Sequence, residues 1–162
     1  MKRGQILLAG GVLLVSLGLS GCGSSSTSPT TTTTSAASLL AKAANTYSAV
    51  FNQMIGKTNA LLPRVNSPVA ATETAGWNAT VAAQRVFDAR VQSIKFPASL
   101  QSDADAVVSA DIAAESIEGT LAFNTDNVSN YNSIFNTLTP ARAAFEAADA
   151  TLSHKLGLVS NG

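Results

Sequence analysis

The chain has 162 residues, of which 46% are hydrophobic, 12% charged and 6% aromatic. Ten basic and ten acidic side chains give a formal net charge of zero, so the chain offers no basic field that would attract nucleic acid. A single cysteine excludes an intrachain disulfide and a zinc site built from cysteines. The length corresponds to one domain.

The N-terminal residues have the composition of a secretory leader. Lys2 and Arg3 precede an apolar run from Ile6 to Leu19 that contains Ile, Leu, Val, Ala, Gly and one Ser. A helix over this run extends roughly 21 Å, which is less than the roughly 30 Å hydrocarbon core of a bilayer. The run therefore indicates a cleaved signal peptide rather than a permanent membrane span.

The leader ends in the residues Leu19, Ser20, Gly21 and Cys22. An aliphatic residue and two small residues ahead of a cysteine resemble the lipobox of bacterial lipoproteins. Small side chains let an extended chain enter a peptidase cleft, and the thiol is the nucleophile that takes a thioether-linked diacylglycerol. The resemblance implies cleavage between Gly21 and Cys22 and lipidation of Cys22.

Lipidation at Cys22 has a physical consequence for location. Two acyl chains, palmitate being a typical one, anchor a protein stably, whereas one chain binds only marginally. The resemblance therefore implies an anchor at the extracytoplasmic face of the cell membrane, or at the outer membrane where the host has two membranes.

A segment of small polar residues follows the cysteine. Residues 23–38 contain twelve Ser or Thr in sixteen positions. Such a segment cannot bury enough apolar surface to offset the entropy of ordering, so we expect a disordered tether. The predicted organisation is a cleaved signal peptide over 1–21, a lipidated cysteine with its tether over 22–38, and a folded domain over 39–162.

The folded domain is predicted to be entirely helical. Alanine favours helix, and prolines tend to begin or end helices. The prolines of this region are Pro63, Pro68, Pro97 and Pro140. We expect helices over roughly 38–62, 68–95, 100–124 and from about 126 onward. Pro63 is expected to end the first, Ser99 to cap the third, and Thr139-Pro140 to kink or split the fourth.

Apolar residues recur at helical spacing on one face of three of these segments. The first stripe is Leu40, Ala44, Tyr47, Phe51, Met54, Thr58 and Leu61, and the second is Trp77, Val81, Gln84, Phe87, Val91 and Ile94. The fourth segment carries Val128, Tyr131, Ile134, Phe135 and Leu138, followed by Ala141, Phe145, Ala148, Leu152 and Leu156. Long helices joined by short connections predict an antiparallel up-down four-helix bundle.

The third helix is acidic, since no Lys or Arg occurs between Lys95 and Arg142. At 100° per residue, Asp111, Glu115 and Glu118 project within about 60° of one another. We expect this stripe to be a solvated edge, paired with an arginine such as Arg85 or Arg90 across the helix pair. The alternative is a divalent-cation site on the three carboxylates. Di-iron chemistry is disfavoured because no Glu-x-x-His occurs.

Other residues give little support for catalysis or a cofactor. His154 is the only histidine and is expected to complement a helix C-terminus, and a haem ligand pair with Met54 has no supporting motif. No Gly-x-Ser-x-Gly elbow is present. We expect the aromatic side chains to pack in the core, with a ligand-binding groove as the alternative. They are Tyr47, Phe51, Trp77, Phe87, Phe123, Tyr131, Phe135 and Phe145.

The sequence therefore predicts a lipid-anchored, non-catalytic interaction or structural module of the cell envelope, without a cofactor. Its expected partners are the membrane, through the lipid on Cys22, and an envelope protein, but no nucleic acid. A carrier of a lipid or other apolar small molecule is the second interpretation. Cation binding through Asp111, Glu115 and Glu118 is the third.

Overall fold

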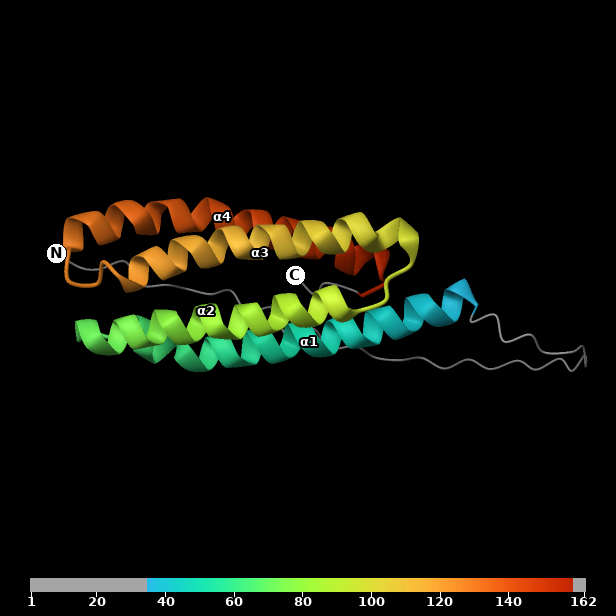
Figure 1. The fold of residues 1–162 in the computed structure, drawn as a ribbon, viewed down its shortest axis with the longest axis horizontal. Helices are drawn as coiled ribbons and strands as arrows, with labels where there is room; N and C mark the ends of the chain where they lie inside the picture. The colour runs from blue at the N-terminus through green and yellow to red at the C-terminus, as the bar shows by residue number, and fades with distance from the viewer. Residues whose placement is uncertain (1–34, 159–162) are drawn as a thin grey trace, which may run out of the picture.

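The computed structural model describes residues 35–158, and these form an antiparallel up-down four-helix bundle, as predicted (Figure 1). In chain order the helices are α1 (Ala36–Val65), α2 (Ala70–Ser93), α3 (Gln101–Ala122) and α4 (Val128–Lys155), with a single 3-10 turn, η1 (Ala98–Leu100), directly before α3. The predicted signal peptide, Cys22 and most of the predicted tether lie outside the described residues. Among the helices of residues 35–158, none is both long enough and apolar enough to cross a membrane.

Helix α1 begins slightly earlier than the sequence predicted. Ser35 precedes the helix, and its side-chain oxygen accepts a hydrogen bond from the Ser38 backbone N–H over 3.2 Å. A serine in this position satisfies one of the free donors of the first turn, and the alanines that follow favour helix. The last residues of the predicted tether, 36–38, are therefore helical.

Two prolines lie inside helices, against the prediction. Pro63 falls in the last turn of α1, which continues to Val65, and Pro140 falls within an undivided α4. The expectation that Pro63 ends the first helix is wrong, and so is a split of the fourth helix at Thr139-Pro140, whereas a kink there stays a prediction. Both prolines are exposed, so water can replace the one missing backbone donor while packing on the other face holds the helix together.

The predicted N-cap of α3 is wrong, whereas α4 has a side-chain N-cap. Ser99 lies within η1 rather than at an N-cap, and Leu100 precedes α3 without a side-chain cap. Asn127 caps α4, because its side-chain oxygen accepts from the Asn130 backbone N–H over 3.1 Å. The asparagine-rich connection therefore supplies the N-cap of α4.

The predicted apolar stripes form the core. Every residue of the first two stripes is buried or partly buried, and the second stripe is buried throughout. In α4 the exception is Val128, which is exposed because it begins the helix beside the loop. Helices α1 and α4 meet through large side chains: Phe51 and Phe145 stack with ring centroids 6.3 Å apart, and Phe87 of α2 packs edge-on against both. These rings fill the middle of the bundle.

Candidate functional site

The acidic stripe of α3 faces the interior, which overturns the expectation of a solvated edge. Asp111 is 1% exposed, Glu115 7% and Glu118 0%. The register of the helix explains this burial. At 100° per residue, all three carboxylates project within the arc bounded by Leu121 and Val108, so burying those apolar side chains also buries the acids. Ala106 and Ala113, on the opposite side of the helix, are exposed.

A fourth carboxylate, that of Asp88 on α2, joins the cluster. One carboxylate oxygen from each of Asp88, Asp111 and Glu115 lies within 4.8 Å of the others, and all three residues are buried. The sequence analysis did not single out Asp88. The sequence nevertheless indicates that Asp88 is buried, because Asp88 follows Gln84 by four residues and therefore continues the second apolar stripe. An acid on such a stripe is a candidate for burial.

Side chains of α2 and α4 form hydrogen bonds with three of the four carboxylates. Gln84 donates from Nε2 to Oδ1 of Asp111 over 3.2 Å. Arg85 donates from Nε to Oε2 of Glu115 over 3.3 Å, which confirms the predicted pairing of the stripe with Arg85. The other predicted arginine, Arg90, lies away from the cluster and donates to Gln53.

Glu118 has the strongest ion pair of the cluster. Arg142 of α4 donates to its Oε1 from Nη2 over 2.6 Å and from Nε over 3.2 Å. The Arg142 guanidinium also lies over the Trp77 ring, 5.9 Å from the centroid, and Trp77 in turn donates from Nε1 to the Tyr131 hydroxyl. The cluster is therefore connected to the core at the end of the bundle where α3 and α4 are joined.

With all carboxyls ionised, several buried oxygens have no hydrogen-bond donor. They are Gln84 Oε1, Asp88 Oδ1, Asp111 Oδ2, Glu115 Oε1 and Glu118 Oε2. Buried polar atoms are nearly always paired, and leaving one unpaired costs about 1–3 kcal/mol, more for a charge. Five such atoms in one place indicate that something else, a proton or a cation, belongs among them.

Burial and mutual repulsion shift the pKa values of these acids upward. Burial, followed by the negative charges of Asp88 and Glu115, raises the pKa of Asp111 to about 8. Burial and the charge of Glu115 raise the pKa of Asp88 to about 7. The pKa values of Glu115 and Glu118 are also raised by burial, although Arg85 and Arg142 respectively oppose the shift.

The charges at the cluster do not balance when it is fully ionised. Four carboxylates carry four negative charges, and Arg85 and Arg142 contribute two positive ones. The donor atoms that the described residues supply here are all carboxylate or amide oxygens, which are hard ligands suited to protons and to Ca²⁺, Mg²⁺ or Mn²⁺. The arrangement can therefore hold positive charge in the interior.

The remaining candidate residues lie elsewhere. His154 is exposed in the last turn of α4, the position expected for a residue that complements the helix C-terminus, whereas Met54 is buried in the core. All the predicted core aromatics are buried or partly buried except Phe123, which is 88% exposed at the end of α3.

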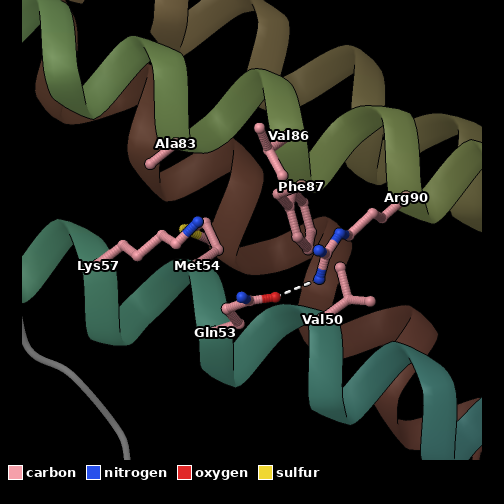
Figure 2. Close-up of a pocket in the computed structure, with 8 residues that line it drawn as sticks. All are labelled: Val50, Gln53, Met54, Lys57, Ala83, Val86, Phe87 and Arg90. Carbon is pink, nitrogen blue, oxygen red and sulfur yellow. Dashed lines mark hydrogen bonds between the residues drawn. The ribbon is translucent and has the colours of Figure 1, made fainter.

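A shallow hollow lies between α1 and α2 (Figure 2). Its empty space of about 180 Å³ includes open solvent, and only about 10 Å³ can hold the centre of a water-sized molecule. Its lining comprises Val50, Gln53, Met54, Lys57, Ala83, Val86, Phe87 and Arg90. Ligand pockets usually measure roughly 300–1,000 Å³, and the two cationic side chains at this hollow do not suit an apolar guest. It gives the carrier interpretation little support.

No family model, curated protein or solved structure matches the chain. The function must therefore be argued from the side chains and their arrangement.

Proposed function

We propose that the protein is a lipid-anchored, extracytoplasmic module of the cell envelope that acts without catalysis, as an interaction or structural protein. The resemblance of Leu19 to Cys22 to a lipobox supports the anchor, and the Ser/Thr-rich segment after it suits a tether. The interaction role is supported by one observation above all: exposed apolar side chains gather at the end of the bundle opposite the start of α1.

The antiparallel topology defines the two ends (Figure 1). Helix α1 begins at one end, which also contains the connection between α2 and α3. The other end contains the α1–α2 and α3–α4 connections, and there Thr74 of α2 donates to the Ala122 carbonyl at the end of α3 over 3.1 Å. Val69 and Phe123 are exposed in these connections, and Val128 is exposed as the first residue of α4. Exposed apolar groups on loops are typical of partner-binding surfaces.

The anchor is tested by replacing Cys22 with serine in the native host. Fractionation should place the wild-type protein and a tether control, Ser26→Ala, in the membrane, and palmitate labelling should mark both. Cys22→Ser should lose the label and retain the leader, which gives it a higher mass than the processed wild type. Unchanged processing and membrane association of Cys22→Ser would refute the anchor.

The interaction surface is tested by placing a photo-crosslinking amino acid at position 123 and, as a control, at Ile112, an exposed apolar residue in the middle of α3. Crosslinking in intact cells should give a discrete product from position 123 and none from position 112. Identical products from both positions would argue against a specific surface at the end of the bundle.

A carrier of an apolar molecule is the second candidate, although the hollow between α1 and α2 is small for it. Native mass spectrometry distinguishes the two. A stoichiometric lipid bound to the purified bundle would favour the carrier, and a bare protein would favour the interaction module.

A further inference from the structure

We propose that Asp88, Asp111 and Glu115 bind a divalent cation, Ca²⁺ by preference, between α2 and α3, with the amide oxygen of Gln84 as a further ligand. This proposal is independent of the lipid anchor and of the surface at Phe123. It assigns a role to side chains that the proposed function does not use.

The spacing of the carboxylates fits a shared ion. Oxygen ligands lie about 2.3–2.6 Å from Ca²⁺, so two ligands of one ion are separated by up to about 5 Å. Oxygens of Asp88, Asp111 and Glu115 lie within 4.8 Å of one another. Because the acids come from two helices, an ion at their centre would join α2 to α3.

The unpaired oxygens provide an observation separate from the clustering of acids. Asp111 is 1% exposed, yet its Oδ2 has no hydrogen-bond partner while Oδ1 is held by Gln84. Gln84 is also buried and leaves its own Oε1 unpaired. A protein interior rarely leaves such atoms without a partner, and a cation would satisfy them together.

The charge of the cluster is the third argument. Glu115 and Glu118 are each paired with an arginine, whereas the ionised carboxylates of Asp88 and Asp111 have no cationic side chain among the described residues. A divalent ion supplies the two missing positive charges. Protons are the competing occupants, so cation binding displaces them from Asp88 and Asp111.

The competition with protons makes the site dependent on pH. The titratable and charged groups that face it are Tyr47 from α1, Asp88 and Arg85 from α2, Asp111, Glu115 and Glu118 from α3, and Arg142 from α4. Affinity should rise with pH as the acids lose their protons, and fall with acidification.

The test is isothermal titration of the full-length protein in detergent, stripped with EDTA, with CaCl₂, MgCl₂ and MnCl₂ at about pH 8. We expect one equivalent of Ca²⁺ to bind, with a dissociation constant no weaker than the roughly millimolar range of extracellular calcium modules. Binding heats in buffers of different ionisation enthalpy should reveal proton release. Mn²⁺ binding, followed by electron paramagnetic resonance, gives a second readout.

The decisive variant is Asp111→Asn, with Asp105→Asn as the matched control. Asp105 lies on the same helix but is exposed, and its side chain accepts a hydrogen bond from Gln101. Asp111→Asn should weaken Ca²⁺ binding at least tenfold, and Asp105→Asn should leave it unchanged. Asp88→Asn, on the other helix, should reproduce the loss.

Folding and binding are separable in this experiment, because an amide at position 111 is neutral. Cation-free Asp111→Asn should melt no lower than the wild type at about pH 8, and circular dichroism should show the same helix content. Absence of binding by the wild type at about 10 mM Ca²⁺, Mg²⁺ or Mn²⁺ would overturn the proposal. Equal affinity of Asp111→Asn and wild type would do the same, because the ion would then lie elsewhere.

Discussion

Tyr47 of α1 donates its hydroxyl hydrogen to Oδ1 of Asp149 of α4 over 2.5 Å, linking the first and last helices of the bundle. Ser153 donates to the same oxygen over 3.3 Å. Burial raises the pKa of Asp149, and the hydrogen bonds from Tyr47 and Ser153 oppose that shift. The Tyr47 hydroxyl is thus the closest hydrogen-bond donor to this partly buried carboxyl.

We expect Tyr47→Phe to lower the free energy of unfolding by about 1.5–3 kcal/mol, the range for a hydrogen bond to a charged group. Urea denaturation followed by circular dichroism would measure it. A double-mutant cycle with Asp149→Asn isolates the pair, since the effect of Tyr47→Phe should shrink once the carboxylate is absent. Equal effects in both backgrounds would show that the hydrogen bond contributes nothing.

The stability of the cation-free protein should fall as pH rises from about 4 to about 8. The pKa of Asp111 is raised to about 8 and that of Asp88 to about 7, whereas both are near 3.9 in an unfolded chain. The folded state therefore retains protons that the unfolded state has lost. Each retained proton lowers the unfolding free energy by about 1.4 kcal/mol per pH unit. Urea titrations in EDTA at several pH values would measure the slope.

The same titration on Asp111→Asn tests which group is responsible. This variant should show a shallower slope and, at about pH 8, a higher stability than the cation-free wild type, because it no longer ionises a buried acid. A wild-type stability that rises over this pH range would contradict the assignment.

Arg142→Met should destabilise the bundle by about 3–5 kcal/mol near pH 8, because it leaves the fully buried Glu118 carboxylate without its counter-charge. Methionine is chosen because it keeps an apolar side chain over Trp77. The loss should diminish on acidification, since Glu118 then becomes protonated. Adding Glu118→Gln should restore part of the stability. If Arg142→Met melts like the wild type at every pH, the ion pair is dispensable.

Two glycines with opposite surroundings provide a packing test. A Cβ at Gly76 of α2 would lie 2.7 Å from the Val65 backbone nitrogen, whereas a Cβ at Gly119 of α3 would meet nothing within 4 Å. Gly76→Ala should cost about 1–3 kcal/mol by forcing α1 away from α2. Gly119→Ala should instead stabilise its helix by about 0.5–1 kcal/mol. Thermal melts that rank the two variants in the reverse order would contradict this packing.

The bundle and its first two apolar stripes were predictable because their apolar residues recur at one helical period. The orientation of α3 was not. Its valines and acids lie on the same side, and the sequence pattern alone favours solvating the acids. Burial became possible only because Gln84 and Arg85 of α2 and Arg142 of α4 come into contact with them, which is a tertiary effect.

The prolines and Asp88 also depend on tertiary contacts that the local sequence does not reveal. Pro140 is a local signal to interrupt a helix, but continuous packing of residues on both sides of it, Leu138 and Leu152 among them, outweighs the loss of one backbone hydrogen bond. Asp88 belongs to a cluster whose other members lie on a different helix, so its role depends on distances that no single segment of sequence encodes.

The length of α1 gives the proposed anchor a geometric meaning. Its 30 residues extend about 45 Å, more than the thickness of a bilayer's hydrocarbon core. If the chain is attached to lipid ahead of Ser35, the far end of the bundle can lie several nanometres from the headgroups. Phe123 would then be able to contact proteins that do not touch the membrane surface.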